Sequence, residues 1–333
     1  MTDIPELDAS TARLRALHEA RLFAEARGLA HRIAAELPEP SPRETIAGLR
    51  ARADLSRALA LVGEGRWARM RNERTLAAAQ RALSPKHAEV ATLLLLHAEI
   101  LSQVVYYPEL EPHLKRAVAI REEALGPDHP DTARALLDWA ELCVRHWHAY
   151  LARPLARRAR AVLEPLSGSL DPEVLRAREL LALAGKGTAP PARIAAELAD
   201  LAHLRERVQG AWHLDLARTL EPAIELEPVV EEAARLYQRV REILVRALDG
   251  AHPRVAGIDA LMAERWMRAG DGARALPLLT GALNALEAAW QVDHPERMPV
   301  YGRITMLLVW AEADPEIAAF KERLRALKDL EKK

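Results

Sequence analysis

Apolar residues in this chain recur with the spacing of an amphipathic helix. After Pro108, intervals of 4, 3, 3 and 4 residues separate successive apolar positions, which places them on one face of a helix with 3.6 residues per turn. The segment Gly126-Pro127-Asp128 is expected to end this helix, and Pro130 suits the first position of the next one. The pattern predicts two helices joined by a tight turn. The apolar positions are Leu110, Leu114, Ala117, Ile120 and Ala124.

The same pattern repeats along the chain at a fixed interval. Short landmarks begin at positions 87, 129 and 171 with a constant 42-residue spacing, and His213 continues this spacing. A 39-residue interval then leads to His252, and a further 42-residue interval leads to His294. Five of these six landmarks begin with His, whose imidazole we expect to cap the helix that follows. A fixed period between about 20 and 50 residues is typical of stacked-repeat proteins.

Residues at three further positions of the repeat recur with the same period. With the first landmark residue counted as position 1, positions 12 and 31 are Ala in several repeats, and such small residues allow neighbouring helices to approach closely. Position 26 is Pro in three repeats, which we expect to lie near the start of the second helix, where a missing N–H costs least. The alanines are Ala98, Ala140, Ala182, Ala263, Ala117, Ala159 and Ala282, and the prolines are Pro112, Pro154 and Pro277.

Two stretches of the chain resemble a known family. Residues 125–132 read Leu-Gly-Pro-Asp-His-Pro-Asp-Thr and follow the helical segment 116–122. Together they resemble the 42-residue tetratricopeptide repeat (TPR) of kinesin light chains and their bacterial relatives, and residues 231–237 with His252-Pro253 are similar to the same consensus. The resemblance implies an all-α fold, a right-handed α-α superhelix (TPR solenoid) of about seven helix pairs. In that family the first helix of each pair lines a concave groove.

This register divides the chain into three segments. We expect residues 1–41 to form N-terminal capping helices, residues 42–294 to form the tetratricopeptide repeat array, and residues 295–333 to form a C-terminal capping helix pair. Residues 185–191 fit a turn between the two helices of the fourth repeat. The repeat at 213–251 is three residues short, and we expect its first helix or its turn to be the shortened part.

The resemblance also implies which residues face a partner. In the family, positions 6, 9, 13, 16 and 17 line the groove, and position 13 is Glu in three repeats of this chain. This column predicts a ladder of carboxylates along the groove, although an exposed row of Glu on a helical face explains it equally well. The candidate groove residues are Thr92, Leu95, Glu99, Gln103, Arg134, Leu137, Glu141, Arg145, Ala260, Glu264, Met267 and Arg268.

One departure from the family concerns positions 9 and 10. Repeats of the kinesin-light-chain type often carry paired Asn there, which hold the extended backbone of a partner. This chain has Leu95-Leu96, Leu137-Asp138, Glu179-Leu180 and Ala260-Leu261 instead. We therefore expect a more apolar groove that suits a partner helix or a second copy of the protein better than a clamped extended peptide.

Composition and charge narrow the partners and the compartment. The chain has 47 Lys and Arg against 48 Asp and Glu, a net charge of −1, so we expect neither nucleic acid nor a membrane surface as a partner. The single Cys143 excludes a disulfide framework. The sequence begins with no charged segment leading into an apolar run, and it has no uncharged stretch of about 18 residues. We expect a cytoplasmic protein.

Candidate chemistry is sparse. His146 and His148, with His113 in the preceding repeat, form the densest imidazole cluster and could suggest a metal. Side chains two residues apart on a helix diverge, and no Cys or paired carboxylate completes a tetrahedral site, so we predict a surface turn and no bound metal. The sequence has no Gly-rich phosphate loop, nucleophile elbow or zinc-protease motif. We therefore expect no catalytic residues and no cofactor, and we predict that the protein is not an enzyme.

These observations favour an interaction protein. We predict a scaffold or adaptor that binds a partner protein or helix in the concave groove of a TPR superhelix. Two alternatives remain open: a peptide-sensing regulatory protein, and an accessory subunit of an enzyme complex. The partner is expected to be a protein or peptide, and a homo-oligomer stays among the candidates.

Overall fold

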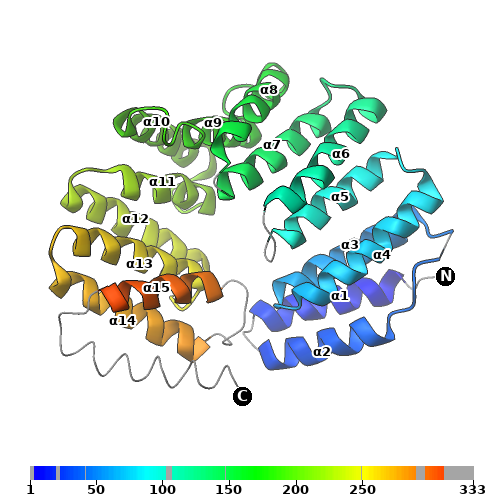
Figure 1. The fold of residues 1–333 in the computed structure, drawn as a ribbon, viewed down its shortest axis with the longest axis horizontal. Coiled ribbons are helices and arrows are strands. Elements are labelled where there is room, and N and C mark those ends of the chain that lie inside the picture. The colour runs from blue at the N-terminus through cyan, green and yellow to red at the C-terminus, as the bar shows by residue number, and fades with distance from the viewer. Residues whose placement is uncertain are drawn as a thin grey trace. The chain divides into compact units, whose positions relative to one another are not determined.

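The computed structural model describes residues 4–19, 23–41, 43–102, 107–146, 148–248, 250–289 and 297–310. Within these ranges the regular structure is entirely α-helical (Figure 1). The all-α repeat fold predicted from the sequence is thus confirmed. The helices are α1 (Ile4–Glu19), α2 (Phe23–Glu36), α3 (Ile46–Leu61), α4 (Gly65–Leu83), α5 (Ala88–Leu101), α6 (Tyr107–Leu125), α7 (Pro130–Arg145), α8 (Ala149–Ser167), α9 (Pro172–Leu183), α10 (Pro191–Gln209), α11 (Leu214–Leu226), α12 (Val230–Leu248), α13 (Pro253–Arg268), α14 (Gly272–Ala289) and α15 (Arg297–Trp310).

The chain forms two compact units, Met1–Ala189 and Pro190–Lys333. In the first, α3 pairs with α4, α5 with α6 and α7 with α8, and the first helices α3, α5, α7 and α9 also contact one another in sequence. In the second, α11 pairs with α12 and α13 with α14, while α15 packs on both α13 and α14. The boundary between the units falls within residues 185–191, which the sequence indicated as a turn inside one repeat.

The repeated alanines lie in the core, as predicted. Position 12 is at most 2% exposed in all four repeats that carry Ala there, and position 31 is at most 3% exposed in all three. Four residues of the apolar stripe on α6, from Leu110 to Ile120, are also buried, whereas Ala124 near its end is exposed. A methyl group at these columns leaves room for the neighbouring helix, so the column sets how closely the helices pack.

Histidine caps begin four of the first helices. The Nδ1 atom of His87, His129, His213 and His252 accepts a hydrogen bond from the backbone N–H two residues further on, at 3.1–3.2 Å. Asp171 has the same role at the start of α9. Thr45 stands one 42-residue repeat before His87 and caps α3 through Gly48, a capping residue that the landmark pattern did not identify. His294 lies outside the described residues.

The prolines at position 26 do not mark helix starts. Pro112, Pro154 and Pro277 lie inside α6, α8 and α14, where each is the sixth residue of its helix. The prediction was wrong by about one and a half turns, because each second helix begins earlier than its proline. A proline at this depth removes one main-chain hydrogen bond and strains the preceding turn.

The short repeat loses its three residues before the start of its second helix. The first residues of α11 and α12 are 16 positions apart, against 19 for α7 and α8 and for α13 and α14. This difference of three equals the difference between the 39- and 42-residue intervals and places the deletion in the first helix and its following turn, as expected from the sequence.

Residues 1–41 contain the helices α1 and α2, and two buried arginines join α2 to the array. Arg52 on α3 donates to the carbonyl of Pro38 at 2.9 Å. Arg71 on α4 donates to the carbonyls of Leu37 and Ala34. Both arginines are at most 6% exposed, so the C-terminal end of α2 is held by buried guanidinium groups. Of the C-terminal pair, α15 is described, and residues 311–333 lie outside the described ranges.

A left-handed residue precedes successive first helices at position 40. Gly126, Gly168 and Gly210, which follow one another at the repeat period, have φ of +97°, +85° and +93°. Ser84 occupies the equivalent position with φ of +87° and ψ of 143°, a region in which a Cβ atom is strained. The register therefore imposes on Ser84 a backbone conformation suited to glycine.

Replacing Ser84 by Gly should raise the free energy of unfolding by about 1 kcal/mol, because the strain at its Cβ is removed. Urea unfolding followed by circular dichroism measures this change. The reverse change, Gly126→Ser, should lower the free energy by a similar amount, since no neighbouring atom lies close enough to its Cβ position to add a clash. An unchanged midpoint in both variants would contradict the strain.

Candidate functional site

The candidate groove residues lie on the first helices, but they are not equally accessible. Thr92, Glu99, Arg134, Arg145 and Arg268 are exposed. Leu95, Glu141, Glu264 and Met267 are half-buried. Leu137 and Ala260 are fully buried, and Gln103 lies outside the described residues.

The burial of position 9 changes the expected character of the surface. Leu137 lies in the apolar core of α7, and Leu95 packs against the same core. Ala260 is likewise enclosed in the second compact unit. Side chains at this position are used for packing between helices, so the substitution of Asn by apolar residues does not by itself make the exposed face apolar. The exposed face is mainly polar.

The three glutamates at position 13 are each joined to an arginine of an adjacent first helix. Glu99 lies 3.9 Å from Arg57 of α3. In the second compact unit, Glu264 of α13 contacts Arg303 of α15 at 2.6 Å. The predicted carboxylate column is therefore a series of interhelical ion pairs, and a partner would meet a charge-balanced surface.

Arg176 is the most enclosed arginine among these three ion pairs. Its guanidinium extends from α9 to Glu141 at 2.5 Å and Asp138 at 3.0 Å on α7, and only 19% of its side chain is exposed. Burial opposes its charge, but attraction to Glu141 and Asp138 prevails and raises the pKa of Arg176. Arg176 is not among the predicted groove residues, although it stands at position 6 of its repeat, in register with Arg134.

A pocket of about 300 Å³ opens on the same face between α3 and α5. Its floor is apolar, formed by Ala53, Leu93 and Leu96, and charged side chains surround it. Arg50 and Glu89 form a bidentate pair across it, with hydrogen bonds of 3.0 and 2.8 Å. Thr92 is the predicted groove residue that lines this pocket.

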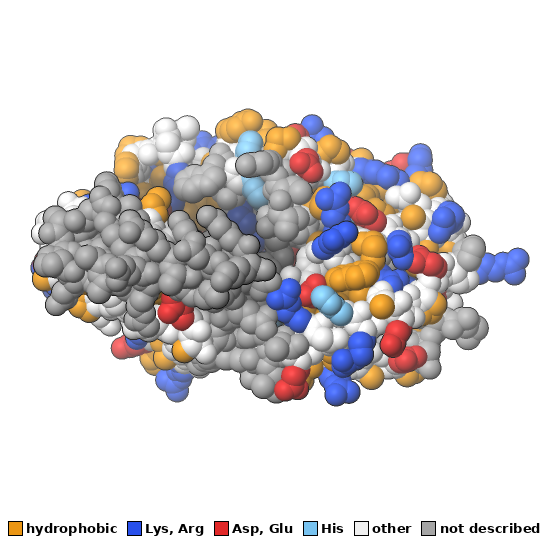
Figure 2. All heavy atoms as spheres, turned by 60° about the horizontal axis from the view of Figure 1, so that its bottom comes forward, with side chains coloured by type: hydrophobic (Ala, Val, Ile, Leu, Met, Phe, Trp, Pro, Cys, Tyr) orange, Lys and Arg blue, Asp and Glu red, His pale blue; other side chains and the backbone are white. Residues whose placement is uncertain are grey.

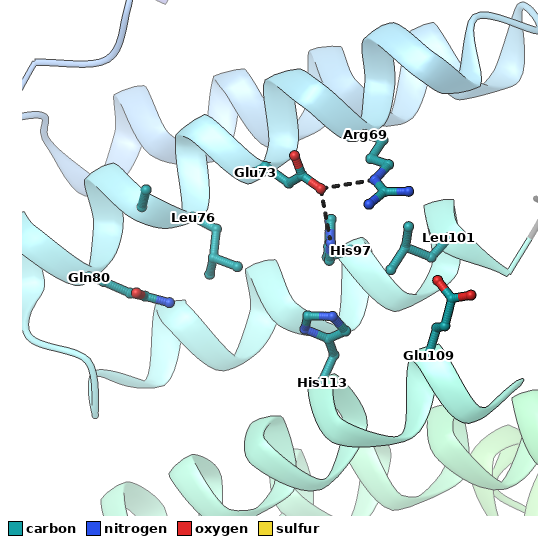
Figure 3. Close-up of a pocket in the computed structure, with 9 residues that line it drawn as sticks. Arg69, Glu73, Leu76, Gln80, His97, Leu101, Glu109 and His113 are labelled. Atoms are coloured by element: carbon teal, nitrogen blue, oxygen red, sulfur yellow. Dashed lines mark hydrogen bonds and ion pairs between the residues drawn. The ribbon is translucent and has the colours of Figure 1, made fainter. Parts of the chain in front are cut away.

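A second pocket, of about 290 Å³, lies between α4, α5 and α6 and was not predicted (Figure 3). Its centre holds His97 of α5 and His113 of α6, whose ring centroids are 4.9 Å apart in an edge-to-face arrangement. The imidazole that His113 contacts is therefore His97, which the sequence analysis did not consider. The signal in the sequence was a single His within the apolar run of α5.

His97 is almost completely enclosed, with 3% of its surface exposed. Burial, followed by the nearby His113, lowers the pKa of His97 to about 4. Burial and Arg116 lower the pKa of His113 as well. Glu73 lies 3.9 Å from Nε2 of His97, too far for a hydrogen bond, and both imidazoles are neutral near pH 7.

Other features of the described residues bear on the type of site. Figure 2 shows one face of the molecule, on which Lys and Arg side chains are interspersed with Asp and Glu side chains. Among the described residues, no group of three His, Cys, Asp or Glu is arranged to hold a metal ion. None of the described helices is both long and apolar enough to cross a membrane.

Arg176→Met should lower the free energy of unfolding by about 1–3 kcal/mol, because two neighbouring carboxylates lose their shared partner. Urea unfolding measures the loss. Arg193→Met is the matched control, since Arg193 pairs with Glu197 on one exposed helix face and its removal should cost less than about 0.5 kcal/mol. If both substitutions lowered the free energy of unfolding equally, the ion pairs of Arg176 between α7 and α9 would contribute no more than an exposed pair within one helix.

The pKa of His97 predicts a dependence of stability on pH. Because folding lowers this pKa from 6.5 to about 4, the neutral imidazole contributes stability above pH 6.5, and that contribution is lost as the pH falls toward 4. In this window wild type should lose up to about 1.4 kcal/mol per pH unit relative to His97→Gln. Urea unfolding between pH 4 and 7.5 tests this, and parallel curves for the two proteins would contradict it.

Comparison with known proteins supports the fold. No protein-family model and no curated protein matches the sequence. A solved Rap protein complexed with competence and sporulation factor is 13% identical, with a TM-score of 0.57 over 98% of this chain and 94% of that one. Aspartyl phosphate phosphatase F from Bacillus subtilis is 12% identical, with a TM-score of 0.52 over 94% and 85%. BtubC (BKLC) from P. vanneervenii is 14% identical, with a TM-score of 0.50 over 72% and 91%. The chain therefore has the fold of tetratricopeptide-repeat proteins, as predicted.

Proposed function

We propose that the protein is an interaction scaffold that binds a polypeptide segment on the first-helix face of its first compact unit. The observation that carries this proposal is the pocket between α3 and α5, with its apolar floor and charged rim. Such a surface suits a segment that inserts one apolar side chain and places polar groups along the rim.

The ion pairs between first helices support a preorganised face. Arg50 and Glu89 join α3 to α5, and Arg176 joins α9 to α7. Cross-helix pairs of this kind fix the positions of exposed neighbours such as Thr92 and Arg134, so a partner binds without first ordering the surface. The near balance of acidic and basic groups favours a partner segment of mixed charge over a strongly acidic or basic one.

A peptide-sensing regulatory role is the second candidate. Its support is the likeness in fold to a Rap protein whose solved structure contains competence and sporulation factor. At 13% identity this likeness concerns the fold alone, so the peptide would have to be identified independently. An accessory subunit of an enzyme complex would use the same face for a folded partner.

We propose no catalytic role. The likeness to aspartyl phosphate phosphatase F is a likeness of fold at 12% identity. Among the described groups, the strongly shifted pKa values are explained by helix packing and ion pairs, as for Arg176.

The proposal predicts that a charge-reversed first-helix face loses its partner. Glu99→Arg combined with Arg134→Glu changes two exposed residues on α5 and α7 and leaves the net charge unchanged. Quantitative affinity capture from the native cell should recover the partner at least about tenfold less efficiently with this variant than with wild type.

The control places the same two changes on second helices. Glu123→Arg and Arg157→Glu are exposed on α6 and α8, and this variant should retain the partner. Circular dichroism must show equal helix content in all three proteins. If the second-helix variant loses the partner while the first-helix variant keeps it, the proposed face is wrong.

A further inference from the structure

The pocket between α4, α5 and α6 lies away from the proposed groove. His97 is two residues from both Leu95 and Glu99 on α5, so it projects from the other side of that helix. The remaining walls come from the second helices α4 and α6 (Figure 3). A ligand in this pocket would therefore bind independently of one on the first-helix face.

The polar lining of the pocket is incompletely satisfied. Nδ1 of His97 is buried and has no hydrogen-bond partner among the described residues. Nε2 of the same ring is 3.9 Å from Glu73, beyond hydrogen-bond range. A buried polar group without a partner is costly, and a neutral imidazole always has one nitrogen that can accept a hydrogen bond.

The charged groups of the lining favour a cation. Glu73 of α4 and Glu109 of α6 stand on opposite sides of His97, whereas Arg69 is the one Arg or Lys among the described residues of the lining. Arg69 is already engaged, since its Nε donates to Glu73 at 2.9 Å. Glu109 is exposed, so with neutral imidazoles the described lining carries an excess of one negative charge, and Arg116, which lowers the pKa of His113, lies outside this lining.

The apolar part of the lining suits an alkyl chain. Leu76 of α4 lies beside Gln80 on one side of the imidazoles, and Leu101 of α5 lies on the other side (Figure 3). Lysine and arginine side chains bury their methylene groups on such surfaces and keep the charged end near polar groups.

We propose that this pocket binds an organic cation with an alkyl stem, either the Lys or Arg side chain of a second protein or a free alkylamine. The stem lies along Leu76 and Ala77. The charged end lies between Glu73 and Glu109 and donates a hydrogen bond to an imidazole. An anion is disfavoured because the single guanidinium is already paired with Glu73.

The test uses the whole chain and two capped amino acids that differ in charge. N-acetyl-lysine methylamide should shift the ¹H–¹⁵N imidazole signals of His97 and His113 saturably, with the two signals assigned through His97→Gln and His113→Gln. N-acetyl-norleucine methylamide has the same alkyl stem without the ammonium group and should cause no saturable shift. Equal binding of the two compounds would overturn the proposal.

The variants test the role of the carboxylates. Glu109→Gln should weaken binding of the lysine derivative roughly fivefold, as expected for loss of one exposed ion pair. Glu123→Gln lies further along α6, where Glu123 pairs with Lys86 outside the pocket, and should bind like wild type. Circular dichroism checks that each variant is folded. Unchanged binding by Glu109→Gln, or equal weakening by both variants, would overturn the assignment.

Two further ligands identify the source of the cation. Tighter binding of free putrescine than of the lysine derivative would assign the pocket to a free amine, and the reverse would assign it to a side chain. Zn²⁺ that shifts both histidine signals at a concentration well below that needed for either amine would overturn the proposal in favour of a metal.

Discussion

The structure depends on close contact between helices that cannot bury their apolar faces alone. Each helix pair leaves an apolar surface that only the next pair can cover, and the alanines at positions 12 and 31 bring the backbones near enough for this to happen. Because the contact is repeated, its register fixes everything that stands at a constant position: the caps, the left-handed turns and the faces presented to solvent. A substitution in one alanine column therefore affects two repeats.

The sequence was sufficient for the fold because the fold follows from this register. The histidine caps could be predicted because the backbone N–H groups in the first turn of a helix have no acceptor within the helix. The imidazole of the landmark histidine supplies that acceptor. The position of the prolines at position 26 was predicted wrongly, because the sequence around a proline inside a helix does not differ recognisably from the sequence around a proline at a helix start. Thr45 was missed because its side chain performs the capping role without resembling the landmark.

The candidate site was predictable only in part. Position along a helix indicated which residues share a face, and Thr92, Glu99 and Arg134 are indeed exposed on the first helices. It did not indicate that Leu137 is buried or that Glu141 is joined to Arg176, because both depend on a neighbouring helix that is distant in the sequence. The contact of His97 with His113 is of the same kind, since it joins two helices of one repeat.

Hydrogen bonds from two arginines of the array to the end of α2 show where the folded array begins. Arg52 and Arg71 belong to the first repeats, yet their acceptors are backbone carbonyls of residues 34–38. A shorter chain beginning at residue 42 would lose these carbonyl acceptors, while Arg52 would keep Glu44, 3.4 Å away on its own side of the boundary. The N-terminal helices are thus structurally part of the first repeats, because they supply main-chain acceptors to two arginines that are buried in the intact chain.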